Sequence, residues 1–103
     1  MNFTLENIIN LIKEYFGKRG ISITTEEFSI KLGGQEIKKI TINNYIIIEK
    51  DDSIKNCRLI IKSTMNIDIM TWRDMAKVIN IIEAQFNNEK IIKELKEINE
   101  KIS

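Results

Sequence analysis

The chain has 103 residues, of which 43% are hydrophobic, so we expect one domain with a single modest core. Its 16 Lys and Arg against 15 Asp and Glu leave a net charge of +1, which excludes a strongly basic protein that binds nucleic acid nonspecifically. The sequence contains no histidine and one cysteine. This excludes Ser-His-Asp and Cys-His catalysis, His-containing zinc sites and CxxC sites within one chain. We expect a non-enzymatic protein without a metal or cofactor.

The compartment and source follow from composition. No apolar run reaches the ~18 residues that a membrane span needs. Residues 1–10 also lack the positively charged N-terminal region and the hydrophobic segment of a secretion signal. We therefore expect a cytoplasmic protein that does not enter a membrane, and we interpret Cys57 as a small buried hydrophobic residue. The predominance of Ile, Lys and Asn is typical of AT-rich genomes and indicates a low-GC bacterium or one of its mobile elements.

The first predicted element is an amphipathic helix over residues 5–16. Its apolar side chains recur at the spacing of one helical face: Leu5, Ile8, Ile9, Ile12 and Phe16. Thr4 is the predicted N-cap, and Gly17 and Gly20 mark the end of the helix.

Residues 21–64 carry most of the β-strand signal. We predict strands at FSIKL, EIKKITI, YIIIEK and CRLIIKST, with turns at Gly33 and Gly34 and at Asn43 and Asn44. An alternative places a short helix, capped by Thr25, over residues 25–32. The strand is favoured because Ile30 would lie off the helical face that carries Phe28 and Leu32.

Two predicted strands contain consecutive apolar residues, over 46–48 and 59–61, which puts apolar side chains on both faces of the sheet. Leaving an isoleucine face in water forgoes on the order of 1.5–3 kcal/mol per side chain, so we expect a cover on each face. The predicted helices over residues 5–16 and 71–86 would cover one face. The other would be covered by the last helix or by a second molecule.

Two helices are predicted after the strands. Thr71 and Asp74 form a capping-box-like pair that starts a helix ending near Asn87 and Asn88. A last helix over residues 89–102 carries an apolar stripe about two heptads long, shorter than a coiled coil usually needs. We treat it as a candidate docking or dimerisation helix. The predicted fold is thus a single α+β domain over 1–103: an N-terminal helix, a three- or four-stranded antiparallel meander and two C-terminal helices.

Nucleic-acid binding is the alternative function. The order of helix, strands and helix resembles the double-stranded-RNA-binding module, which implies phosphate contacts by Arg73 and Lys77, although Asp74 interrupts the clustered lysines of that module. A winged helix-turn-helix is the alternative fold, with a short helix at 25–32 and a recognition helix near QEIKKI, residues 35–40. Either fold would suit a nucleic-acid-binding protein or transcriptional regulator.

The favoured function is a small protein-binding module that inhibits a partner by steric occlusion. In size, composition and lack of catalytic motifs the chain is similar to accessory proteins of phages and mobile elements, including anti-CRISPR inhibitors of host defence. Its partner would be another protein or a second copy forming a homodimer. Trp72 also fits the helix stripe, so a core position is its alternative. The candidate partner-binding residues are Lys38, Lys39, Tyr45, Arg58, Lys62, Trp72, Arg73 and Lys77.

Overall fold

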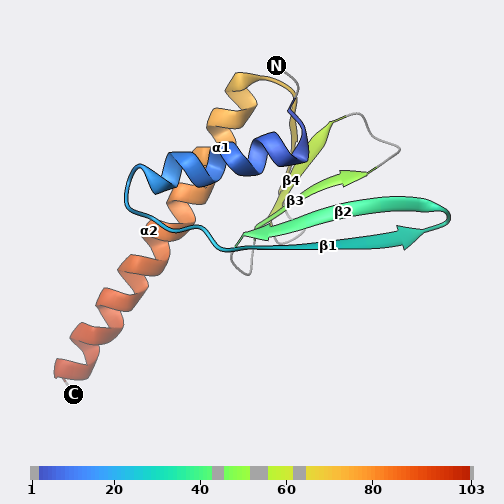
Figure 1. Cartoon of the computed structure of the whole chain (residues 1–103). Coiled ribbons are helices and arrows are strands. Elements are labelled where there is room, and N and C mark those ends of the chain that lie inside the picture. The colour runs from blue at the N-terminus through green and yellow to red at the C-terminus, as the bar shows by residue number, and fades with distance from the viewer. Residues whose placement is uncertain (1–2, 43–45, 52–55, 62–64, 103) are drawn as a thin grey trace.

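A computed structural model describes residues 3–42, 46–51, 56–61 and 65–102 and shows an α+β fold (Figure 1). A five-stranded antiparallel sheet lies between two helices in the sequence, and its strands are ordered as they follow along the chain. The elements are α1 (Leu5–Gly17), β1 (Thr25–Leu32), β2 (Gln35–Ile42), β3 (Ile46–Asp51), β4 (Cys57–Ile61), β5 (Met65–Ile69) and α2 (Trp72–Ile102).

Helix α1 confirms the predicted N-terminal helix and both of its end signals. The backbone N–H of Asn7 donates to Thr4 Oγ1 at 3.2 Å, so Thr4 is the N-cap. The helix ends at Gly17, and Gly20 adopts a φ of 74°, where a residue with a Cβ would be strained. The N–H of Ile21 then donates to the Phe16 carbonyl at 2.9 Å, which turns the chain towards the sheet.

The first hairpin decides between the two alternatives for residues 25–32. They form strand β1, so the alternative short helix is wrong. Gly33 and Gly34 have φ values of 58° and 83°, and Leu32 lies opposite Gln35, as a two-residue turn with two left-handed residues requires. Because residues 35–40 lie in β2, the winged-helix alternative is wrong as well.

The sheet has one strand more than predicted. Strand β5 pairs antiparallel with β4, from Cys57 opposite Ile69 to Ile61 opposite Met65. Its sequence, MNIDI, alternates apolar and polar residues, which is the pattern of a strand with one buried face, so the sequence carried a signal for β5 that the prediction missed. The turn expected at Asn43 and Asn44 lies outside the described residues.

The C-terminal region is one helix rather than the predicted two. Helix α2 runs unbroken for 31 residues through Asn87 and Asn88, where we expected a stop. Asparagine inside a helix is less favourable than alanine by only about 0.7 kcal/mol, and neither glycine nor proline stands there to end the helix.

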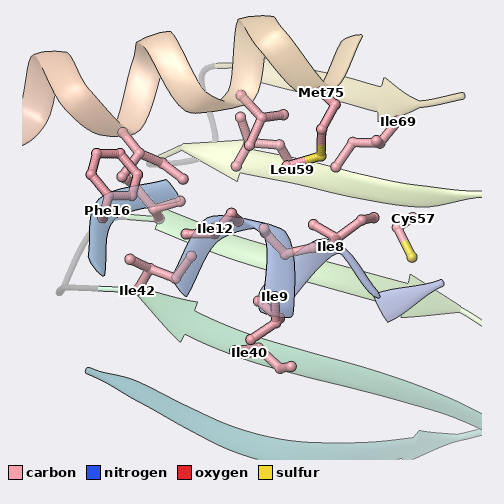
Figure 2. Close-up of a cluster of buried hydrophobic side chains, with 14 residues drawn as sticks. Ile8, Ile9, Ile12, Phe16, Ile40, Ile42, Cys57, Leu59, Ile69 and Met75 are labelled. Atoms are coloured by element: carbon pink, nitrogen blue, oxygen red, sulfur yellow. The ribbon is translucent and has the colours of Figure 1, made fainter. Parts of the chain in front are cut away.

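The core lies between one face of the sheet and both helices (Figure 2). Helix α1 contributes Ile8, Ile9, Ile12 and Phe16; α2 contributes Met75, Val78 and Ile82; the sheet contributes Ile40, Ile42, Ile46, Ile48, Cys57, Leu59 and Ile69. Along β3, Ile46 and Ile48 are fully buried whereas Ile47 points to the other face and is half-buried. The consecutive isoleucines of β3 therefore point alternately to the core face and to the far face of the sheet.

The far face of the sheet is not covered by the C-terminal helix, so that expectation is wrong. Within the described residues both helices pack on the core face, and the second half of α2 projects away from the sheet (Figure 1). The molecule is correspondingly elongated, measuring 56 × 30 × 21 Å. Cross-strand neighbours shield the far face in part: Ile47 lies opposite Ile60, and Ile30 lies opposite Ile37.

Candidate functional site

A groove of about 520 Å³ lies between α1 and the first turns of α2, outside the buried core. Both helices are held there by the core residues on their inner faces, so the walls of the groove are fixed by the fold. The groove is lined on one side by Leu11, Glu14, Tyr15, Lys18 and Arg19, and on the other by Trp72, Met75, Ala76, Ile79 and Asn80.

Trp72 is the only tryptophan of the chain and the first residue of α2, and 57% of it is exposed. A reciprocal cap fixes the start of this helix: Asp74 Oδ2 accepts the Met70 and Thr71 N–H groups, and Thr71 Oγ1 accepts the Asp74 N–H. The indole also packs edge-on against Phe3, with ring centroids 5.1 Å apart. The core alternative for Trp72 is therefore wrong, and a large apolar surface stays accessible in the groove.

Tyr15 and Arg19 form the opposite rim. They are four residues apart, and the guanidinium carbon of Arg19 lies 3.6 Å from the centre of the Tyr15 ring. Arg19 Nη1 also donates to the Tyr15 carbonyl at 3.0 Å, and the Tyr15 ring packs edge-on against Phe16 in the core. The rim is therefore a planar cation and an aromatic ring held in one arrangement.

The charges around the groove are unequal. Lys18 and Arg19 supply two cations where α1 ends, against the single carboxylate of Glu14. Apolar walls with a basic end favour an apolar ligand that carries an acidic group.

Of the eight residues predicted to bind a partner, the groove contains one, Trp72. Arg73 and Lys77 belong to α2 but do not line the groove. Tyr45 and Lys62 lie outside the described residues.

The predicted cations of the sheet lie on two different faces. On the far face, Lys39 lies 3.7 Å from Glu49, and Arg58 Nε donates to Asp68 Oδ1 at 2.9 Å. That hydrogen bond and charge pair raises the pKa of Arg58. Lys38 lines a second, more polar hollow of about 530 Å³ between α1 and the first hairpin, where it is accompanied by Glu6, Lys13 and Glu27. The structure thus does not bring these cations together.

Sequence reasoning missed Tyr15 and Arg19. Their spacing of four residues on a predicted helix was visible, but only the packing of α1 beside α2 places them opposite Trp72.

The described residues were also considered as metal ligands and as nucleophiles. They include no group of three or more Cys, Asp or Glu side chains that could hold a metal ion. Cys57 is fully buried, and its burial raises the pKa of the thiol, outweighing the opposite effect of the Lys50 charge. Neither of the helices formed by the described residues is both long and apolar enough to cross a membrane.

Comparison with known proteins gives no relative from which a role could be transferred. No protein-family model, no curated protein and no solved structure matches the chain. The groove between α1 and α2 therefore has to be interpreted from its own residues.

Proposed function

We propose that this chain is a non-enzymatic protein-binding module that takes an apolar helical segment of another protein into the groove between α1 and α2. The observation that carries the proposal is the grouping of Trp72, Tyr15 and Arg19 around one apolar hollow. Tryptophan, tyrosine and arginine are the residue types most enriched among those that dominate binding energy at protein interfaces.

The shape and charge of the groove support the choice of ligand. A trough between two helices is a common receptor for the apolar face of a third helix. Lys18 and Arg19 at its basic end favour a segment that carries Asp or Glu beside its apolar residues. The module would act by steric occlusion of a partner's working surface, as small inhibitors from phages and mobile elements do, including anti-CRISPR proteins.

Peptide selection with a fluorescence readout tests this function. Peptides selected from a random displayed library on the immobilised protein should carry apolar residues and an acidic residue. Because Trp72 is the only tryptophan and lies in the groove, binding should shift its emission to shorter wavelength. Arg19→Ala should raise the Kd about tenfold or more. Lys77→Ala is the matched control, since Lys77 is a cation on α2 outside the groove.

Trp72→Ala removes the fluorophore and is measured by calorimetry, where binding should be lost. Peptides that bind wild type and Trp72→Ala equally well would overturn the groove as the binding site. The nucleic-acid alternative is tested with single- and double-stranded 20-mer oligonucleotides. Binding that weakens steeply with salt and depends on Arg73 and Lys77 would favour that alternative instead.

A further inference from the structure

The second half of α2 carries an apolar stripe that the rest of the described chain does not cover. Five large side chains along it are between 50% and 79% exposed. They are Ile91, Ile92, Leu95, Ile98 and Ile102. Five such side chains within twelve residues form a contiguous apolar surface, which marks an interaction site.

This stripe points away from the core of its own chain. Ile82 is buried against the sheet, and Ile91 follows it by nine residues, which is about two and a half helical turns. The two side chains therefore point to opposite sides of one continuous helix. Because α2 is unbroken between them, the stripe cannot fold back onto the core without breaking the helix.

The stripe has the spacing of a helix-pairing seam, with steps of four, three and four residues. The seam residues are Ile91, Leu95, Ile98 and Ile102. Such a seam is completed by another helix with the same spacing, and a second copy of α2 provides one.

We propose that the second halves of α2 from two copies of this chain pair antiparallel and form a homodimer. In this pair Leu95 lies opposite Ile98 of the second copy, and Ile91 lies opposite Ile102 of the second copy. Twofold symmetry repeats both contacts, which gives four apolar layers over residues 91–102.

The charges beside the seam select this arrangement. Glu94 and Lys101 each lie three residues after one seam residue and one residue before the next, and in an antiparallel pair such positions flank the seam on the same side, whereas Glu97 lies further round the helix. The register that sets Leu95 against Ile98 brings Glu94 within about 3 Å along the helix axis of Lys101 of the second copy. Symmetry makes two opposite-charge pairs.

The competing arrangements lack these pairs. Shifting the antiparallel register by one heptad places Glu94 beside Glu94 of the second copy. A parallel pair places Glu94 beside Asn99 of the second copy and, if continued along the helix, Lys77 against Lys77 of the second copy. Like charges disfavour the shifted register, and the parallel pair over residues 91–102 lacks the attraction between Glu94 and Lys101.

The dimer would carry two grooves, one at each end. Asn80, the last α2 residue that lines the groove, precedes Ile91 by eleven residues, about 16 Å of helix, so pairing over residues 91–102 leaves the groove open. A partner with two docking segments would then be held at both ends with increased avidity. This consequence rests on the proposed function of the groove, whereas the dimer does not.

Sedimentation equilibrium over a range of concentrations tests the dimer. Wild type should show a reversible dimer, and Leu95→Asp should be monomeric with an unchanged circular dichroism spectrum, because Leu95 contacts nothing in the core. Glu94→Lys should raise the dimer Kd about tenfold, since it replaces two attractions by two repulsions. The double variant Glu94→Lys, Lys101→Glu should restore dimerisation. Glu97→Lys makes the same charge change on the outer side of the pair and should leave the Kd unchanged.

Disulfide trapping in a Cys57→Ser background tests the orientation. A mixture of Ile91→Cys and Ile102→Cys chains should crosslink, whereas Ile102→Cys alone should not, because the two copies of position 102 lie about 16 Å apart along the axis. A crosslink formed by Ile102→Cys alone would establish a parallel pair and overturn the proposal. A wild type that stays monomeric up to about 1 mM would overturn it too.

The two proposals fail separately. The monomeric variant Leu95→Asp should bind a single groove peptide with the same Kd as wild type. Loss of peptide binding in a chain that still dimerises would overturn the groove alone, and retained peptide binding by a monomeric wild type would overturn the dimer alone.

Discussion

The ring of Phe3 packs edge-on against the indole of Trp72, with centroids 5.1 Å apart and an interplanar angle of 76°. The segment before α1 thereby touches the first residue of α2, 69 positions later in the chain, and orients the most exposed aromatic side chain of the groove. We therefore expect this contact to affect binding at the groove as well as stability.

Phe3→Ala should lower the free energy of unfolding by about 0.5–1.5 kcal/mol for the lost ring contact, and further through the apolar area that Phe3 no longer buries against the core. It should also raise the Kd for groove peptides, because the indole is no longer held in place. Chemical unfolding and Trp72 fluorescence measure the two effects. Phe3→Tyr keeps the ring and is the control; equal losses in both variants would contradict a role for the edge-on contact.

Ile47 and Ile48 are neighbours in the sequence but face opposite sides of the sheet. Ile48 is fully buried in the core, so Ile48→Ala should lower the free energy of unfolding by about 2–5 kcal/mol. Ile47 is half-buried on the far face, so Ile47→Ala should lower it by less than about 1.5 kcal/mol. Urea titrations of both variants give the comparison. Similar losses at the two positions would mean that the far face is covered as well as the core face.

Cys57 should be chemically protected in the folded state. Its side chain is fully buried, its Sγ donates to the Phe3 carbonyl at 3.5 Å, and burial raises the pKa of the thiol. Modification by a thiol reagent at neutral pH should therefore be slow in buffer and fast in urea. Asn66→Cys in a Cys57→Ala background puts a thiol on the exposed far face and should react at once. Rapid modification of Cys57 in the native protein would contradict its burial.

The same group gives a dependence of stability on pH. A thiol pKa that is higher in the folded than in the unfolded chain contributes stability below the ordinary value of about 8.5, and this contribution is lost as the pH rises through the folded pKa. The urea midpoint of the wild type should therefore fall more between neutral and alkaline pH than that of Cys57→Ala. Parallel curves for the two proteins would contradict the prediction.

Asp74 should stabilise the start of α2 as a carboxylate. The hydrogen bond from the Met70 N–H is the main cause that lowers the pKa of Asp74, and hydrogen bonds from Thr71 add to it. Desolvation acts in the opposite direction and is the weaker effect. A lowered folded pKa gives stability that is present above the ordinary value of about 3.9 and is lost as the pH falls through the folded pKa.

Asp74→Asn should accordingly lower the urea midpoint at neutral pH, and its difference from wild type should disappear in strong acid. Glu97→Gln, at an exposed position of α2 remote from the start of the helix, is the control and should have no such effect. A pH-independent difference for Asp74→Asn would indicate lost packing rather than lost charge.

The sequence by itself determined the elements that depend on near neighbours. The apolar spacing of residues 5–16 and the Thr4 cap predicted α1, the two glycines predicted the hairpin turn, and Thr71 with Asp74 predicted the start of α2. Each of these signals acts within about four residues, so no distant part of the chain is needed to decide them.

Only the tertiary structure decided the remaining features. The pairing of β5 with β4 and the packing of both helices on the same face of the sheet are set by contacts between distant residues. The groove depends on α1 lying beside α2, which brings Tyr15 opposite Trp72. These features rest on contacts between residues far apart in the sequence, whose free energy outweighs local preferences of a few tenths of a kcal/mol per residue.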